Sequence, residues 1–189
     1  MEPAQRLIPA AVGQFDASTV AAVAHGAAPF CGGLVRLPRA RDPPRGRTAV
    51  SGPSSPPNPT SRSQTIDRGD GFVVLTAEYN HGYPAVLKNA MDWTFVEWRH
   101  KPISFVGWGN VGGARAIEQL RAVAVEFEMA PLCHAVHILP EVMIPILRST
   151  EPLGTSAFAT LEPRLKMLAE DLAWWTAALA AARERDATV

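Results

Sequence analysis

Apolar residues in the last two thirds of the chain fall into short runs that are separated by segments with helical spacing. The runs at 72–75, 102–108 and 132–138 have the length of strands, although His134 and His137 interrupt the third. The first is also rich in β-branched residues, which is typical of a strand covered on both faces in a parallel sheet. The pattern predicts three parallel strands.

Helical spacing appears between and after these runs. Apolar positions recur every three or four residues over 114–127, which predicts a helix. A C-terminal amphipathic helix, with Thr160 as its N-cap, is predicted by a longer series: Leu161, Leu165, Leu168, Leu172, Trp175 and Leu179. Residues 140–158 show no firm period and stay unassigned. Alternating strands and helices predict an α/β fold with helices on both faces of the sheet.

The first sixty or so residues differ from the rest of the chain. They hold ten of the seventeen prolines, and residues 1–63 carry seven Arg, no Lys and three acids, a charge of +4 against −4 for the remainder. The composition of 42–60 is typical of disorder, so we expect disorder from about 38 to 62, with a short helix at 18–26 and a short strand at 34–37 before it. The expected organisation is an atypical segment over 1–62 and one domain over 63–185.

Length, charge and cysteine content argue against several classes of protein. A chain of 189 residues with 47% hydrophobic content suits one α/β domain. Its net charge of zero gives no electrostatic case for nucleic acid, and no run approaches the roughly 18 apolar residues that span a bilayer. Cys31 and Cys133 lack metal-ligand spacing, and there is no signal-peptide pattern. We therefore expect a cytoplasmic protein with two unlinked thiols, no metal site and no nucleic-acid or membrane partner.

One loop carries most of the candidate chemistry. The run from Thr76 to Trp93 reads T-A-E-Y-N-H-G-Y-P-A-V-L-K-N-A-M-D-W and joins the first strand to a helix, with Pro84 suited to the first helical turn. Its polar residues follow the carboxyl end of a strand, where open α/β sheets hold their ligands. A second loop, G-W-G-N-V-G-G from Gly107 to Gly113, follows the next strand.

The first loop resembles the P/A-E-Y-N-x-(G/S)-x-P-x-x-L-K-N-x-x-D-W signature of the NADPH-dependent FMN reductase family, and the second resembles that family's glycine-rich third flavin loop. The resemblance extends from about Ser63 to Ala182. It implies a flavodoxin-like three-layer fold with a parallel sheet and an atypical or incomplete N-terminal part. Asn110 replaces one glycine of the second loop, and Asn is the residue that best tolerates positive φ after glycine.

The resemblance also implies a cofactor site. The residues that would contact FMN are Glu78, Tyr79, Asn80, His81, Gly82, Gly109, Asn110, Gly112 and Gly113. NADH or NADPH would pass hydride to the flavin, which would reduce a small-molecule electron acceptor such as a quinone or free flavin. Because the flavin performs this chemistry, no catalytic side chain is expected.

Several residues in and near the two loops have more than one possible role. Asn80 either caps the turn or contacts the pyrimidine edge of the flavin, and the full signature favours contact. Glu78 pairs with a basic residue across a subunit contact, orients the loop, or has no role. His81 is a candidate proton donor, but packing or solvent exposure is favoured. Lys88 and Asn89 are expected to be structural. Trp108 covers the flavin, lies in a subunit contact, or belongs to the core.

The sequence of the N-terminal part does not contain the phosphate-binding loop motif of the family. No strand followed by G-S-x-R-x-x-S, which holds the FMN phosphate at a helix N-terminus, is found in residues 1–63. In the family's strand order 2-1-3-4-5, loss of the first strand would leave the 72–75 strand as a bare apolar edge, unless the N-terminal segment supplies another strand. The alternative function is a non-catalytic or damaged homologue that dimerises but binds FMN poorly.

An oligomer is expected. The helix over 84–93 and the aromatic residues Phe95 and Trp98 after it are denser in aromatics than packing on a sheet requires, and Trp, Tyr and Phe are enriched in interface cores. The family resemblance also implies a homodimer or homotetramer.

Overall fold

A computed structural model describes residues 33–38, 64, 66–148 and 155–186 of the chain. Within these residues the sheet has four strands, in the spatial order β1 (Gly33–Pro38), β2 (Gly69–Ala77), β3 (Pro102–Trp108) and β4 (Ala130–Ile138). β2, β3 and β4 are parallel, with Phe72 opposite Ile103 and Val106 opposite Val136. The three predicted strands are therefore confirmed, and the bounds of β3 are those that the sequence predicts.

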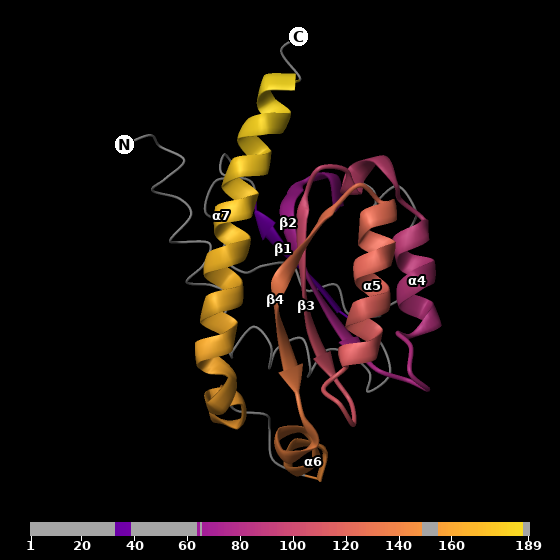
Figure 1. The fold of residues 1–189 in the computed structure, drawn as a ribbon, viewed down its shortest axis with the longest axis vertical. Helices are drawn as coiled ribbons and strands as arrows, with labels where there is room; N and C mark the ends of the chain where they lie inside the picture. Colours follow the sequence, from indigo (N-terminus) through magenta and orange to yellow (C-terminus); the bar gives the residue numbers. More distant parts are fainter. Residues whose placement is uncertain (1–32, 39–63, 65, 149–154, 187–189) are drawn as a thin grey trace.

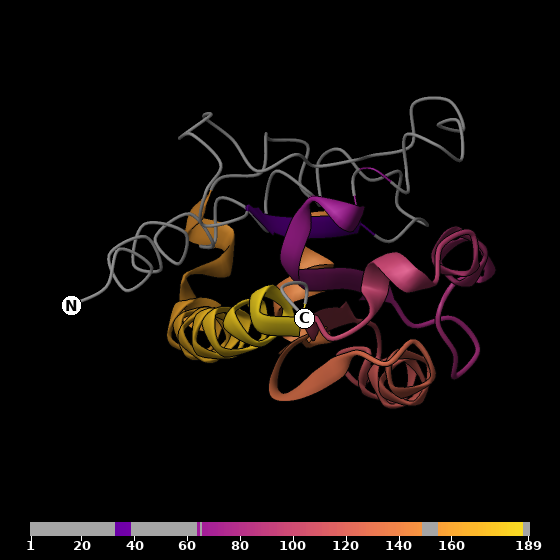
Figure 2. The ribbon, with the colours of Figure 1, turned by 90° about the horizontal axis from the view of Figure 1, so that it is seen from above.

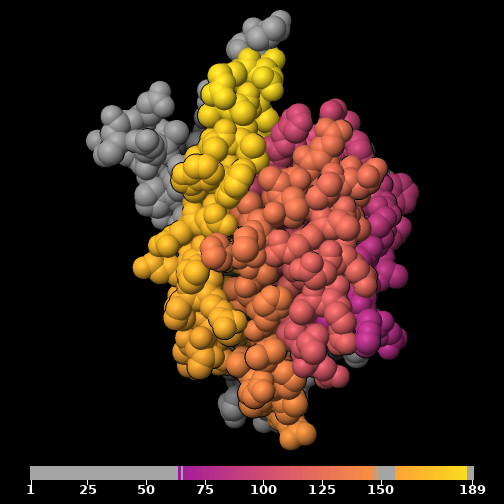
Figure 3. Space-filling model, viewed as in Figure 1, coloured from indigo at the N-terminus to yellow at the C-terminus, as the bar shows by residue number. Residues whose placement is uncertain are grey.

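Helices cover both faces of the sheet. The described helices are α4 (Ala85–Asp92), α5 (Ala114–Glu126), α6 (Pro140–Arg148) and α7 (Glu162–Asp186), with short 3-10 helices η1 (Val96–Trp98) and η2 (Thr155–Leu161). Figures 1 and 2 show α7 on one face and α4 with α5 on the other. In the space-filling view, α7 and α4 lie at opposite sides of the molecule, and β4 and α5 lie between them (Figure 3). The three-layer α/β fold is confirmed.

The core lies in two layers because successive strand residues point to opposite faces. Val73 and Leu75 of β2 pack with Leu165, Leu168 and other α7 residues. Phe72 and Val74 pack on the other face, with side chains of α4 and α5. A strand buried on both faces needs a continuous apolar run, which is what the sequence of β2 supplies.

The strand predicted at 34–37 forms β1 and covers the exposed side of β2. It pairs antiparallel to β2, with Gly33 opposite Leu75 and Pro38 opposite Gly69. The N-terminal segment thus supplies the strand that protects this edge, although it runs opposite to its neighbours. The helix predicted at 18–26, the disorder predicted for about 38–62 and the question of a phosphate loop in 1–63 otherwise lie outside the described residues.

Three predictions near the helices need correction or completion. Thr160 is not an N-cap, because it lies within η2, which runs directly into α7. Residues 140–148 form α6, with Pro145 inside it. Trp98, predicted in a subunit contact, is buried in the core: it packs on the rings of Phe72 and Phe127, and its indole N–H donates to the carbonyl of Met91.

None of the described helices combines the length and hydropathy required to cross a bilayer.

The two faces of α7 make a test of this packing possible. Leu168 is fully buried against the sheet, whereas its neighbour Met167 is 50% exposed. We expect Leu168→Ala to lower the free energy of unfolding by about 2–5 kcal/mol, since truncation of a buried leucine leaves a cavity. Met167→Ala should change it by less than about 0.5 kcal/mol. Urea unfolding of both variants measures the difference, and equal losses would contradict the observed face of α7.

Candidate functional site

The two polar loops lie side by side at the carboxyl edge of the sheet. β2 and β3 end in register, with Ala77 opposite Trp108. The next residue, Glu78, continues the pairing, since its N–H donates to the carbonyl of Trp108 over 2.9 Å. A Cβ built on Gly109 would lie 3.1 Å from the Cβ of Glu78, so the loops are in close contact. The sequence motifs therefore meet at one place, as their positions after parallel strands predict.

The first loop is a tight two-residue turn. Tyr79 and Gly82 exchange both backbone hydrogen bonds, at 2.8 and 2.9 Å. Asn80 and His81 between them have φ values of 48° and 69°, the pattern of a type I′ turn. Both residues are exposed, and their N–H groups make no hydrogen bond to the part of the chain that the structure describes. Asn80 therefore occupies the first of the two turn positions and is exposed, and its contact with a flavin stays a prediction.

The glycine loop brings bare backbone close to β3 and β4. A Cβ on Gly113 would lie 2.8 Å from the Cα of Gly107, and one on Gly112 would lie 2.7 Å from the Cβ of His137. Both glycines have positive φ, as has Gly109. The expectation of positive φ at Asn110 is wrong, because that residue is not among those with positive φ. Its replacement of a glycine therefore adds no backbone strain.

Glu78 links the first loop to helix α5. Its carboxylate accepts hydrogen bonds from the backbone N–H of Arg115 over 3.0 Å and from the Arg115 Nε over 2.6 Å, and its side chain is only 4% exposed. Burial raises the pKa of this carboxyl, but the hydrogen bonds and positive charge of Arg115 outweigh burial and hold the pKa below its ordinary value of 4.5. Of the three interpretations of Glu78, the structure supports loop orientation, with a partner in the same chain.

Helix α5 also holds the tip of the turn. Arg115 Nη1 lies 2.8 Å from His81 Nε2, and Gln119 donates to the carbonyl of His81 over 2.8 Å. His137, at the end of β4, contacts the carbonyl of Gly112 through Nδ1 at 3.0 Å. Sequence reasoning missed Arg115, Gln119 and His137. The first two are one helical turn apart directly after the glycine loop, and that spacing was the available signal.

The remaining predicted residues have structural positions. Trp108 is partly buried against the core layer under α7, which supports the core interpretation. Lys88 and Asn89 lie in α4, where Lys88 forms an ion pair with Asp92 over 2.6 Å. Within the described residues there is no group of His, Cys, Asp and Glu side chains suited to a metal ion.

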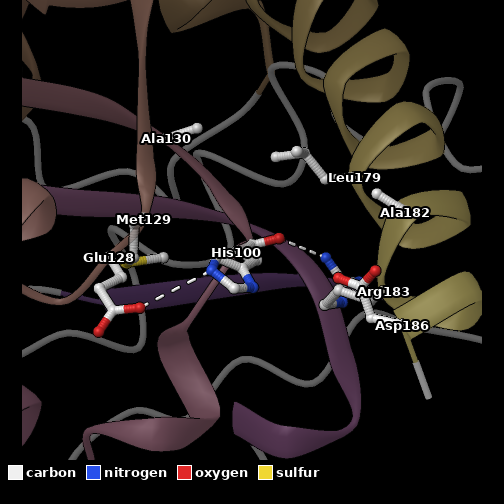
Figure 4. Close-up of a pocket in the computed structure, with 8 residues that line it drawn as sticks. All are labelled: His100, Glu128, Met129, Ala130, Leu179, Ala182, Arg183 and Asp186. Carbon is white, nitrogen blue, oxygen red and sulfur yellow. Dashed lines mark hydrogen bonds and ion pairs between the residues drawn. The ribbon is translucent and has the colours of Figure 1, made fainter. Parts of the chain in front are cut away.

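A separate cavity lies at the opposite, amino edge of the sheet. It has a volume of about 340 Å³ and is lined by His100, Glu128, Met129, Ala130, Leu179, Ala182, Arg183 and Asp186 (Figure 4). One of its charged residues is paired: Arg183 forms an ion pair with Asp70 over 2.7 Å and donates to the carbonyl of His100 over 2.5 Å. These contacts fasten the end of α7 to the start of β2. The cavity therefore lies at the other end of the strands from the two candidate loops.

Comparison with known proteins identifies related sequences. The family model of NADPH-dependent FMN reductases matches residues 17–143, so the match begins upstream of β1. An NAD(P)H-dependent FMN reductase of Schizosaccharomyces pombe is 40% identical over 96 residues, which cover 47% of this chain and 48% of that protein. A quinone reductase of Escherichia coli (strain K12) is 38% identical over 69 residues, 33% of this chain and 37% of that protein. The chain thus spans about half, or less, of the length of these curated relatives.

A solved structure also resembles the chain. FerB, a flavoenzyme NAD(P)H:(acceptor) oxidoreductase from Paracoccus denitrificans, matches with a TM-score of 0.49 and 22% sequence identity, covering 65% of this chain and 69% of that chain.

The Glu78 contact predicts a pH-dependent contribution to stability. Because the pKa of Glu78 is lowered by folding, the stabilisation is fully present above its ordinary value of 4.5 and is lost as the pH falls through the lower folded value. We expect Glu78→Gln to reduce the free energy of unfolding at pH 7 by about 1.5–3 kcal/mol, the range for hydrogen bonds to charged groups. This loss should shrink as the pH is lowered to about 3.

The matched control is Glu118→Gln. The Glu118 side chain is 77% exposed, and its ion pair with Arg121 is long, at 3.5 Å. Its replacement should therefore change the free energy of unfolding little at any pH. Denaturant unfolding at both pH values tests the pair. A loss in Glu78→Gln that does not depend on pH would contradict the ionised contact.

Proposed function

The chain belongs to the NADPH-dependent FMN reductase family, and we propose that it is an FMN-dependent oxidoreductase that takes hydride from NADH or NADPH and reduces a small acceptor. The observation that carries this proposal is the juxtaposition of the two family loops at the carboxyl edge, joined by the Glu78 N–H to Trp108 and by the Glu78 carboxylate to Arg115. A quinone is the acceptor class that the name of the Escherichia coli relative favours. Free flavin is the other candidate.

The donors at this edge fit a flavin. Its isoalloxazine ring is flat, with an apolar face and a pyrimidine edge of alternating acceptors and a donor. The exposed N–H groups of Asn80 and His81, with the side-chain amide of Asn80, supply the complementary donors and acceptor. The glycine loop beside them presents backbone with few side chains, so a flat ring can approach it.

When bound, FMN would supply the redox chemistry, in which hydride from the nicotinamide is accepted and electrons are passed to the acceptor. The protein residues would have supporting roles: Asn80 and the turn amides would hold the edge of the ring, and the glycine loop would lie beside it. Glu78 neutralises the charge of Arg115, so the turn meets its ligand without a net positive charge. No side-chain acid is required for hydride transfer, and we assign no catalytic residue.

Substitution of Asn80 tests the contact. Because Asn80 has φ of 48°, Ala would add backbone strain there, whereas Gly removes the side chain without it. We expect both Asn80→Gly and Asn80→Ala to raise the FMN dissociation constant by about 3- to 10-fold, the equivalent of one net hydrogen bond. Fluorescence titration of FMN measures the affinity, and thermal unfolding checks that the fold is intact.

Asn89→Ala is the matched control, since Asn89 is exposed on α4 and should leave affinity unchanged. An unchanged affinity in Asn80→Gly would contradict the assignment of the side chain. A wild-type protein that binds no FMN would instead favour the alternative, a non-catalytic homologue that keeps the fold.

The same proposal includes a homodimer or a larger homo-oligomer. Four apolar residues on and after α4 are exposed, namely Val86, Trp93, Phe95 and Val96. Large apolar side chains that are exposed close together in the sequence are candidates for a protein interface. Trp98 is excluded from that surface by its burial.

A charge in this surface should dissociate the oligomer. We expect Trp93→Glu to give the mass of a single chain by light scattering at micromolar concentration, because the carboxylate cannot be desolvated there. Trp174→Glu is the control: Trp174 lies on α7 and is 64% exposed, against 57% for Trp93. A wild-type monomer, or dissociation by both variants, would contradict the proposed interface.

A further inference from the structure

Helix α5 contacts His81, the second residue of the turn. Its φ of 69° lies in the left-handed region, which Asn, Asp and His adopt more often than other residues with a Cβ. Arg115 contacts its ring and Gln119 binds its carbonyl, both at 2.8 Å. Side-chain and backbone contacts from one helix therefore fix the same residue of the turn.

The contact with Arg115 is compatible with only one hydrogen-bonding role of the His81 ring nitrogen. A guanidinium group has only N–H donors and does not lose its charge in proteins. The Nε2 atom that lies 2.8 Å from Arg115 Nη1 must then accept a hydrogen bond, which requires its lone pair. The contact is therefore a hydrogen bond only in the ring form that has its proton on Nδ1. A protonated ring would place donor against donor and two positive charges in contact.

Among the residues that the structure describes, no carboxylate forms an ion pair with His81. The Glu78 carboxylate is already bound by the backbone and side chain of Arg115. Glu118 on α5 forms an ion pair with Arg121, and Lys88 on α4 forms one with Asp92. Gln119, the other α5 residue that contacts His81, is uncharged.

We propose that neutral His81 is the positioning residue of this turn: its Nε2 accepts from Arg115, and this contact holds the exposed amides of Asn80 and His81 where a flavin would meet them. Acidification removes the acceptor and releases the turn. The ligand rests on the function proposed above, but the contact itself is a property of the protein alone.

The first test needs no flavin. In nitrogen-15 NMR of the full chain at about pH 8, His81 should be the neutral tautomer with Nδ1 protonated, and His81→Gln identifies its signals. On lowering the pH to about 5, the backbone amides of Asn80 and Gly82 should shift in the wild type and in His134→Gln, a control at an exposed histidine of β4. They should stay in place in His81→Gln, whose side-chain oxygen still accepts from Arg115. A proton on Nε2 at about pH 8, or amide shifts retained in His81→Gln, would overturn the proposal.

The second test measures FMN affinity. Between about pH 8 and pH 5 the FMN dissociation constant should rise about fivefold or more in the wild type and in His134→Gln, and less than about twofold in His81→Gln. The same rise in His81→Gln as in the wild type would overturn the role of His81. Failure of the wild type to bind FMN at either pH would refute the proposed function, while the tautomer and amide shifts would still decide the role of His81.

Discussion

A buried carboxylate that must be paired determines how the functional edge of this molecule is built. An ionised side chain that is almost fully buried is tolerated only where charge and hydrogen bonds compensate for lost hydration. Glu78 finds both at the start of α5, from the backbone and the guanidinium of Arg115. Because Glu78 follows β2 and Arg115 follows the glycine loop after β3, this one contact fixes the two loops relative to each other.

The sheet and its helices make that contact possible. Parallel pairing of β2 with β3 brings their carboxyl ends into register, and α5 begins at Ala114, directly after the glycine loop that follows β3. At the opposite edge, Arg183 of α7 forms an ion pair with Asp70 of β2 beside the cavity. The two edges differ in what they offer a ligand: an exposed turn at one, and a cavity whose Arg183 is already paired with Asp70 at the other.

Local patterns in the sequence predict most of the fold but few of the contacts that build the site. The strand at 102–108 and the helix at 114–127 follow from apolar spacing, since both depend on neighbouring residues. The antiparallel direction of β1 and the burial of Trp98 depend on residues distant in sequence, so no local pattern shows them. The positions of the loops at a strand end predict where a site lies. The pairing of Glu78 with a residue 37 positions away needs the tertiary structure.

The central claim is that flavin binds at the carboxyl edge, on the turn and the glycine loop. Backbone amide spectra of the nitrogen-15-labelled chain, recorded during titration with FMN, test it most directly. The account predicts that the largest saturable shifts fall on residues 78–82 and 109–113, with little change around His100, Glu128 and Arg183. Shifts concentrated at those three residues, which line the amino-edge cavity, would contradict it.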